Sequence, residues 1–337
     1  GRCAGGIRAS FTSEVHVTLM MESIRRWIRW SKEVPGIEFH QDGYLWLLTS
    51  EEEVKLHENL MKLHNTLGVP TRMLYGEEVK EVAPTIKLND VLGALHDPTA
   101  GKASPFHTIS ALRRELIAGG VKIFEYVKVR KLIEGSGRVK ALEFEGGGEV
   151  GVEGHVVVGA GYQSRELLKS LGYEVPVVGD PHHLMITEKV APFLKPLVIH
   201  KASGSYVNQV PSGGVIIGTE FPVPENDLRL RFAFIEKAVK NMAKYFPQIL
   251  SANLLRVWIG YYLKTPDHHP IIGLLPHHDN LLVATGFSGH GYMMAPIVGE
   301  ELASIIHLGK PRNPETEKLR PSRFQEGKLL EEKAVFG

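Results

Sequence analysis

The residues with the clearest chemical potential form one glycine-rich stretch near the C-terminus, Gly286-Phe287-Ser288-Gly289-His290-Gly291-Tyr292-Met293. It follows an apolar strand predicted over 281–284 and precedes a helix predicted from about 296 to 307, with Glu300 and Glu301 in its first turn. Glycines let the backbone approach a ligand closely, and a helix N-terminus offers free N–H groups and a partial positive charge. The stretch therefore predicts an anion-favouring site; the alternative is a strand-to-helix turn around a buried histidine.

Three pairs of adjacent histidines suggest metal chemistry: His182-His183, His268-His269 and His277-His278. Adjacent residues on a strand point to opposite faces, so such a pair rarely binds one ion. No His-x-x-x-His spacing on a predicted helix and no carboxylate cluster accompanies them. We therefore predict no metal site, and we expect these histidines to be solvated or to lie in loops.

A second glycine-containing stretch, Gly159-Ala160-Gly161-Tyr162-Gln163-Ser164, follows an apolar strand predicted over 155–158. With Asp180 further along the chain, it could pass for a nicotinamide-dinucleotide fingerprint. However, the third glycine is replaced by Ser164, the helix predicted over 165–171 is short, and Pro176 interrupts the next strand. A nicotinamide site here is the weaker alternative.

Composition limits the partners of the chain. The 337 residues are 43% hydrophobic and 23% charged, which is typical of a globular protein, and their length suggests two domains. Lys and Arg total 39 against 38 for Asp and Glu. This balance gives no reason to expect nucleic acid or an anionic membrane as partner, and favours a small ligand. The single cysteine, Cys3, excludes an intramolecular disulfide and fits a cytoplasmic protein.

The sequence shows no apolar run long enough for a membrane span and no secretory signal. The longest apolar run, 254–263, is too short to span a bilayer, and no charged leader precedes an apolar segment. The chain opens on a glycine-rich loop, Gly1-Arg2-Cys3-Ala4-Gly5-Gly6-Ile7-Arg8, with no strand before it. We therefore expect an N-terminal truncation.

The elements that must position these residues alternate between helix-rich and strand-rich blocks. Periodicity, N-caps and glycine stops predict helices over 13–34, 50–68, 105–119 and 228–245. Strands are predicted over 44–48, 92–96, 126–133, 139–144, 184–188, 205–209, 214–219 and 255–263. The interleaving predicts a mixed α/β (α+β) fold of two discontinuous domains. One is assembled from 1–34, 101–178 and 266–325, the other from 35–100 and 179–265, and 326–337 forms a tail.

Four stretches together resemble the family of FAD-dependent amino-acid oxidases and dehydrogenases. They are Gly286–Met293, the segment from Trp258-Ile259-Gly260 through Thr265-Pro266-Asp267 to Gly273, Gly5-Gly6-Ile7-Arg8, and Val156–Gly161 with Ser164. They occur in the order of the family and cover nearly the whole chain. Within the family, the likeness is strongest to β subunits of archaeal L-proline dehydrogenase and of sarcosine oxidase.

The resemblance implies a Rossmann-like FAD-binding domain with an antiparallel-sheet substrate domain. It further implies that FAD is bound by Gly5, Gly6, Ile7, Arg8, Val129, Gly159, Gly161, Gly286, Ser288, Gly289, His290, Gly291, Tyr292 and Met293. The binding is expected to be non-covalent, because Gly260 stands where some relatives carry a flavin-linking cysteine. The catalytic set would be Tyr262, Lys264, His290 and Met293, with Tyr262 facing the substrate and Lys264 a candidate ligand of its carboxylate.

Two departures from the sarcosine oxidases favour a dehydrogenase. Met293 stands in place of a carboxylate-binding lysine, and Ile216 in place of a lysine that activates oxygen. Without that cation, superoxide beside the flavin is less stabilised. We therefore expect hydride transfer from a secondary amine or amino acid, of the L-proline or sarcosine type, to flavin N5. The electrons would then pass to a partner subunit or another non-oxygen acceptor.

Two alternatives remain open. One is an oxygen-using oxidase of glycine, sarcosine or a D-amino acid. The other follows from the start of the chain, where the family's strand, G-x-G-x-x-G turn and helix, about 30 residues, are not found. On that view the chain is a non-catalytic or defective truncated subunit.

Overall fold

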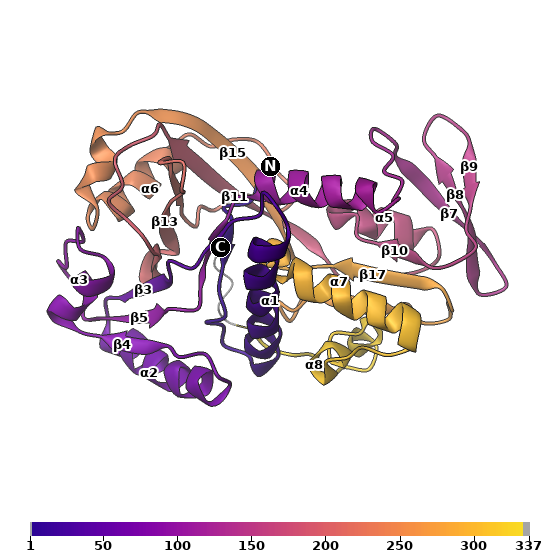
Figure 1. Ribbon diagram of the computed structural model, residues 1–337, viewed down its shortest axis with the longest axis horizontal. Coiled ribbons are helices and arrows are strands. Elements are labelled where there is room, and N and C mark those ends of the chain that lie inside the picture. The colour runs from indigo at the N-terminus through magenta and orange to yellow at the C-terminus, as the bar shows by residue number, and fades with distance from the viewer. Residues whose placement is uncertain (1, 333–337) are drawn as a thin grey trace.

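The computed structural model describes residues 2–332 and is built around an eight-stranded sheet, seen on the side of α2, α3 and α6 in Figure 1. Its strands, in spatial order, are β15 (Leu254–Lys264), β11 (Val178–Thr187), β14 (Val215–Gly218), β13 (Ser205–Gln209), β12 (Leu197–His200), β3 (Tyr44–Leu48), β5 (Gly93–Asp97) and β4 (Arg72–Leu74). Only β12 and β3 pair in parallel, and they join two segments that are far apart in the sequence. The other neighbours in this sheet are antiparallel.

Both faces of this sheet are buried, which explains why β3 reads as an uninterrupted apolar run. Leu45 and Leu47 pack into a core with α6 (Ala233–Ala243), whereas Tyr44, Trp46 and Leu48 pack into another core on the opposite face. Alternate side chains of a strand point to opposite faces, so one run supplies both cores. Helices α2 (Glu51–Thr66) and α3 (Val79–Val82) lie near the end of the sheet formed by β4 and β5.

The second half of the molecule is built on a three-stranded sheet in the order β10 (Val156–Val158), β17 (Leu281–Thr285), β16 (Ile271–Leu274). Strands β10 and β17 are parallel. Helices α1 (Glu14–Glu33) and α7 (Gly291–Leu308) pack side by side, and their core includes Trp27, Met20, Met294 and Ile297 (Figure 1). The Ser13 side chain caps α1 by accepting a hydrogen bond from the His16 N–H.

Smaller elements complete the fold. One three-stranded sheet consists of β1 (Gly6–Ile7), β6 (Gly101–Ala103) and β2 (Phe39–His40); another consists of β7 (Val129–Gly135), β8 (Arg138–Phe144) and β9 (Glu149–Gly151). The remaining helices are α4 (Pro105–Ala118), α5 (Ser164–Lys169) and α8 (Pro314–Glu317). The predicted mixed α/β class is confirmed. Within residues 2–332, no helix is both long and apolar enough to cross a membrane.

The start of α7 differs from its prediction. The helix begins at Gly291, so Pro296 lies inside it, and Glu300 and Glu301 lie well beyond its first turn. Proline was expected near the helix start because it has no N–H to donate within the helix. Here the glycine loop itself turns directly into the helix, and the Met294 N–H already donates to the His290 carbonyl.

Two other predicted elements are shorter than expected. Helix α6 begins at Ala233 instead of 228, and β7 begins at Val129 instead of 126. Residues 121–128 form no strand, and they are exposed although several of them are apolar, including Phe124 and Tyr126. Nearby, β10 has a ladder with β17 alone among the described strands, which leaves its other edge open. Such an edge can accept another strand.

Candidate functional site

A cavity of about 300 Å³ lies where three parts of the chain converge. The parts are the N-terminal segment 2–6, the neighbouring strands β11 and β15, and the loop 287–293 between β17 and α7. Its lining includes His182, Tyr262 and Met293. The cavity therefore joins the eight-stranded sheet to the half of the molecule that carries α1 and α7.

The loop reaches β15 because two of its glycines have left-handed backbones, with φ of +71° at Gly286 and +91° at Gly289. A Cβ atom at Gly289 would lie 2.6 Å from the Tyr262 ring, so only glycine fits there without movement. The Ser288 N–H donates to the Leu263 carbonyl at 2.8 Å and fixes the loop to the strand. The expected close approach of this loop thus includes an approach to Tyr262.

The N-terminal segment is held just as tightly. A Cβ atom at Gly6 would lie 1.7 Å from the Tyr44 hydroxyl oxygen, and one at Gly5 would lie 2.4 Å from the Ala103 carbonyl oxygen. Both glycines also line the cavity. Their backbone therefore forms a thin wall between the cavity and the core behind it.

Several buried polar atoms near the cavity have no hydrogen-bond partner among the described residues. They are both ring nitrogens of His290, the Ser288 Oγ and the Tyr44 hydroxyl. Ser288 lines the cavity, and His290 lies between two glycines that do. An unsatisfied buried polar group costs about 1–3 kcal/mol. The atoms therefore suit a polar ligand in the cavity.

His290 is neutral in this environment. It is fully buried against Phe11 and His16, at ring-centroid distances of 4.6 and 5.3 Å. Burial, followed by the charges of His16 and Arg8, lowers its pKa well below the usual value. Its imidazole can therefore offer one donor and one acceptor to a ligand but is a poor acceptor of a proton.

Tyr262 belongs to a linked set of polar side chains on β11 and β15. Its ring stacks on His182, with centroids 3.9 Å apart and planes 19° apart. The His182 Nε2 lies 2.8 Å from the Asp180 carboxylate, which also pairs with the Lys264 ammonium. Burial raises the pKa of Asp180, but the hydrogen bonds from His182 and Lys264 outweigh it and lower that pKa to about 2.

Arg8 lies behind the cavity. It is fully buried, donates to the Ser10 carbonyl at 2.7 Å, and stacks its guanidinium over Phe11 at 3.8 Å. Burial lowers its pKa, although the nearby Tyr44, Glu332 and Asp97 act in the opposite direction. Arg8 therefore places a positive charge beneath the N-terminal segment without lining the cavity.

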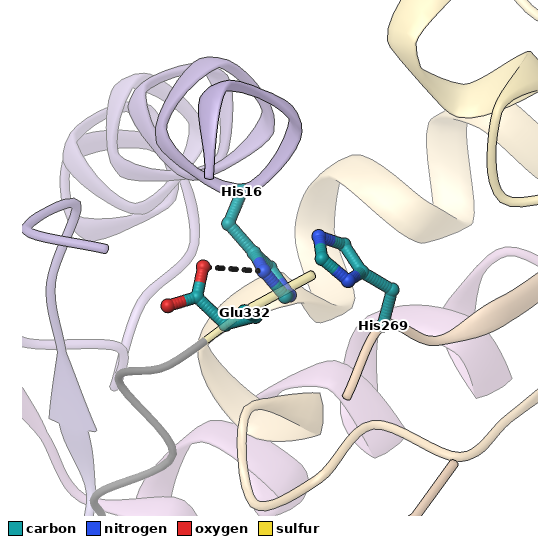
Figure 2. Close-up of side chains that lie close together, drawn as sticks. All are labelled: His16, His269 and Glu332. Atoms are coloured by element: carbon teal, nitrogen blue, oxygen red, sulfur yellow. Dashed lines mark hydrogen bonds and ion pairs between the residues drawn. The ribbon is translucent and has the colours of Figure 1, made fainter. Parts of the chain in front are cut away.

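Figure 2 shows a buried cluster formed by His16, His269 and Glu332. The cluster lies beside the loop 287–293, since the His16 and His290 ring centroids are 5.3 Å apart. Its potential ligand atoms lie within 4.8 Å of one another. The His16 and His269 rings are stacked, with centroids 4.3 Å apart and planes 21° apart. A metal ion lies near the plane of each imidazole that binds it, because the nitrogen lone pair is in the plane. Two nearly parallel rings at this separation cannot both do so without turning. The cluster is therefore held by hydrogen bonds, including His16 Nδ1 to Glu332 at 3.1 Å.

The histidine pairs differ in part from their prediction. As expected of adjacent strand residues, His182 faces the cavity while His183 stacks on Phe234 on the opposite side of the sheet. The expectation that these histidines are solvated or lie in loops is wrong for His182 and His183, which both lie in β11; His183 is buried and His182 is bound to Asp180. His269 and His278 are also buried. Each of these three buried rings contacts another ring, on His16, Tyr173 or Phe234, and the spacing of the pairs does not reveal these contacts.

The structure brings many of the predicted site residues together. The cavity is lined by Gly5, Gly6, Tyr262, Ser288, Gly289, Gly291, Tyr292 and Met293. Ile7, Arg8, Gly286 and His290 neighbour this lining in the chain without belonging to it. Gly161 is linked to the start of the loop, since its carbonyl accepts from the Thr285 hydroxyl at 3.2 Å, and Gly159 precedes it at the end of β10.

Two predicted residues lie elsewhere. Val129 is on β7, in a separate sheet. Lys264 lines a neighbouring cavity of about 710 Å³ with Thr265 and His268, and it pairs with Asp180, whose carboxylate also contacts His182 in the wall of the Tyr262 cavity. A third cavity, of about 310 Å³, is lined by Ile216 and shares Cys3 and Ala4 with the Tyr262 cavity.

Sequence reasoning missed three residues of the site: Asp180, His182 and Arg2. In the sequence, Asp180 stands out only as part of a possible nucleotide fingerprint, and His182 only as one member of an adjacent histidine pair. Their i, i+2 spacing on a strand was the available signal, since it places both on one face. Arg2 lines the cavity, and its carbonyl accepts a hydrogen bond from the Trp258 ring N–H at 3.1 Å, a contact across 256 positions that has no local signal.

Comparison with known proteins agrees with this arrangement. The profile of the family described as FAD dependent oxidoreductase matches residues 1–305. The chain is 28% identical to the sarcosine oxidase subunit beta of Arthrobacter sp., over 97% of this chain and 81% of that protein. It is 24% identical to the mitochondrial sarcosine dehydrogenase of Mus musculus, over 89% of this chain and 34% of that protein.

Solved structures show the same fold. The L-proline dehydrogenase of P. horikoshii superposes with a TM-score of 0.92 and 34% identity, covering 97% of this chain and 88% of that one. The glycine oxidase of Geobacillus kaustophilus superposes with a TM-score of 0.86 and 23% identity, covering 95% and 87%. On the family match and the superposition together, the protein belongs to the family of FAD-dependent oxidoreductases.

Proposed function

We propose that the protein is a dehydrogenase that oxidises the C–N bond of a secondary amine or amino acid, of the L-proline or sarcosine type. The observation that carries this proposal is the cavity in which the glycine loop meets Tyr262. Its volume of about 300 Å³ suits a small substrate beside part of a cofactor. The likeness to L-proline dehydrogenase and sarcosine oxidase subunit beta supports the substrate class.

The residues around the cavity fit FAD. The glycine backbones of 5–6 and 286–291 leave room for close approach, and the start of α7 favours negative charge. The unpartnered His290 nitrogens and Ser288 Oγ supply hydrogen-bonding groups for a polar ring system. When bound, FAD supplies the redox chemistry by accepting a hydride equivalent from the carbon beside the amine. We propose that it is held non-covalently by the loop 286–293 and the segment 5–8, with Val129, Gly159 and Gly161 toward its adenine end.

The roles of the surrounding side chains follow from their positions. Tyr262, fixed by Gly289 and His182, would orient the substrate. Arg2 is the one cationic side chain in the described lining and would hold a carboxylate. Tyr292 and Met293 would shape the pocket and exclude water, and Lys264 would act through Asp180. The protein thus holds the reacting carbon in place.

The third cavity supports a dehydrogenase rather than an oxidase. Ile216 places an apolar side chain there, and such a side chain cannot stabilise superoxide. Two lysine or arginine side chains, Lys102 and Arg256, line the same cavity as Ile216. The Lys102 ammonium donates hydrogen bonds to the Lys195 and Gln209 carbonyls, and Arg256 lies on the exposed end of β15. We therefore propose that electrons leave to a non-oxygen acceptor in partner subunits, within the cytoplasm.

An absorbance experiment tests the proposal. The protein is loaded with FAD, and L-proline, sarcosine and primary amino acids are added without oxygen. We expect the flavin absorbance near 450 nm, a general property of oxidised flavins, to bleach with the secondary amines and to return with an artificial acceptor dye. Stoichiometric peroxide after admission of air would favour the oxidase alternative. A chain that binds no FAD would support the non-catalytic alternative and end the proposal.

Tyr262→Phe sharpens the test, because it removes a hydroxyl and preserves the ring that contacts Gly289 and His182. We expect KM for the amine to rise about tenfold, as for the loss of one good hydrogen bond, with FAD affinity unchanged. Tyr75→Phe is the matched control, since the Tyr75 hydroxyl donates to the Glu58 carboxylate at 2.7 Å on the surface, away from the cavity. An equal effect of both changes would contradict the role of Tyr262.

A further inference from the structure

Asp180 and His182 lie on one face of β11 and contact each other. Their side chains share a face because they are two residues apart on a strand. The Asp180 Oδ2 lies 2.8 Å from the His182 Nε2 and also pairs with Lys264. Although burial raises the pKa of Asp180, these two partners lower it to about 2, so the carboxylate is ionised at neutral pH.

This contact fixes the tautomer of His182. An ionised carboxylate can only accept a hydrogen bond, so the proton of the neutral imidazole lies on Nε2. The other nitrogen, Nδ1, then carries a lone pair. Because the ring lines the cavity and stacks on Tyr262 at 3.9 Å, a proton acceptor belongs to the wall where Tyr262 would orient the substrate.

Amine oxidation requires such an acceptor. An aliphatic amine is an ammonium ion at neutral pH, since its pKa is about 8–10. An ammonium nitrogen has no lone pair with which to form the C=N bond as hydride leaves the adjacent carbon. The proton must therefore be removed before or during oxidation.

We infer that His182 accepts this proton, with Asp180 holding its ring and stabilising the resulting imidazolium. The inference rests on the proposed function. In this step one N–H bond of the substrate ammonium breaks and an Nδ1–H bond forms on His182, while the nitrogen keeps the electron pair. Nothing is oxidised or reduced in the transfer, and the proton passes to solvent when the product leaves.

The groups around His182 favour this assignment. Besides Asp180, the titratable or charged side chains near it are His183, Tyr262, Lys264, Arg2, Cys3 and Tyr292. Tyr262 and Tyr292 have raised pKa values, chiefly from burial, so they remain protonated and cannot accept the proton. His183 faces the other side of the sheet. His290 is a poor acceptor because burial lowers its pKa.

The pH dependence of His182→Asn provides the test. Near pH 7, kcat/KM for L-proline should fall about 100-fold, a typical contribution of general-base catalysis. It should then rise about tenfold per pH unit and approach wild type near pH 9, because the substrate loses the proton by itself. Asp180→Asn should give a smaller loss with the same pH recovery. His155→Asn, on the exposed loop before β10, is the matched control and should leave the profile unchanged.

Ligand binding gives a second readout that does not depend on turnover. Calorimetry at about pH 7, on FAD-loaded protein that dithionite has already reduced under argon, compares L-proline with L-tetrahydrofuran-2-carboxylate, which has the same ring and carboxylate but no amine. In His182→Asn we expect the affinity for the oxygen analogue to stay within about twofold, and that for L-proline to fall about tenfold, near the effect of one charge-assisted hydrogen bond. Loss of both affinities would mean that His182 only supports the pocket and would overturn the inference.

The outcomes distinguish failure of the proposed function from failure of the proposed role of His182. If wild-type protein with FAD is not reduced by any amine, the proposed function fails. If wild type is reduced and His182→Asn loses the same fraction of kcat/KM at every pH, the function stands and the role of His182 as proton acceptor fails. Only pH-dependent recovery together with retained binding of the oxygen analogue supports the inference.

Discussion

Gly289 and Tyr262 touch so closely that each determines what the other position can hold. The glycine has a φ of +91°, and a Cβ atom there would meet the Tyr262 ring at 2.6 Å. Gly289→Ala should therefore lower the free energy of unfolding by about 1–3 kcal/mol through backbone strain alone, and displacement of the ring should further raise KM. Chemical denaturation monitored by tryptophan fluorescence, together with amine kinetics, measures both effects.

Gly299→Ala is the control for this prediction. Gly299 lies in α7, no atom approaches the position of its Cβ within 4 Å, and it is exposed. Alanine there should stabilise the protein by about 0.5–1 kcal/mol. If Gly289→Ala were as harmless as Gly299→Ala, the tight contact with Tyr262 would be refuted.

The sequence shows the glycine loop readily, and family resemblance points to Tyr262, but the neighbours of Tyr262 are harder to predict. His182 was grouped with His183 as a possible metal pair, although the two side chains end on opposite faces of β11. Its role depends on the pairing of β11 with β15, which sets Asp180 opposite Tyr262. Register between strands that are about 80 residues apart has no local signal.

At the level of elements, the loop 265–270 is fixed by a fully buried ion pair between Asp267 and Arg323. Arg323 donates to both carboxylate oxygens, at 2.9 and 3.0 Å, and the Leu330 N–H, the His269 N–H and the Thr265 hydroxyl also donate to this carboxylate. Asp267→Asn should cost about 3–5 kcal/mol, because it leaves a buried guanidinium uncompensated. Removing both charges in Asp267→Asn with Arg323→Met should cost less than the sum of the single changes, as a double-mutant cycle would measure.

Glu315→Gln is the surface control for this cycle. It breaks the Lys318–Glu315 pair of 2.7 Å, whose lysine is exposed, and should change stability by at most about 1 kcal/mol. Additive effects of the two buried changes would show that Asp267 and Arg323 are not coupled in the folded protein.

The same ion pair predicts a pH dependence of stability. Burial raises the pKa of Asp267, but Arg323 outweighs it and lowers the pKa below its usual value. A lowered pKa stabilises the folded state above the unfolded pKa of about 3.9, and this contribution is lost as pH falls through the folded value. Wild type should therefore lose more stability in acid than Asp267→Asn does, in denaturation curves between about pH 5 and about pH 2.

Element boundaries were predicted where capping signals are local, as for α1, α2 and α4. The start of α7 was predicted too late, because Pro296 was expected near the first turn of the helix. The helix begins at Gly291, directly after the glycine loop. Residues 121–128 were predicted partly as strand from their apolar pattern, yet they form none. Strand formation requires a partner as well as propensity, and the described part of the chain offers none to this segment.

Across the whole molecule, the protection of backbone amides from hydrogen exchange should differ between the eight-stranded sheet and residues 121–128. The amides of β12, β3 and β13 lie inside the eight-stranded sheet with buried cores on both faces, whereas residues 121–128 are exposed and outside any strand. Hydrogen exchange followed by mass spectrometry should show slow exchange in the former and fast exchange in the latter. Protection of 121–128 equal to that of β12 would mean that another surface covers this segment.

Mutational sensitivity should follow the same division. Trp46 is 1% exposed and donates to the Ser10 hydroxyl, whereas Phe124 is 72% exposed. Trp46→Ala should cost about 3–5 kcal/mol in denaturation experiments, and Phe124→Ala less than about 0.5 kcal/mol. The burial of β3 was predictable from its uninterrupted apolar run. The parallel pairing of β12 with β3, which closes the sheet across distant segments, was not.

The adjacent histidines of β11 have a consequence for how this site tolerates insertions and deletions. Because side chains alternate along a strand, a register shift of one residue in β11 would bring His183 to the face where His182 now lies. That face would therefore still carry an imidazole. The residue two positions earlier would then be Pro181, which has no carboxylate. A shifted strand would thus keep the histidine of the site but lose its carboxylate. Relatives with such a shift should therefore carry an acidic residue at the position of Pro181.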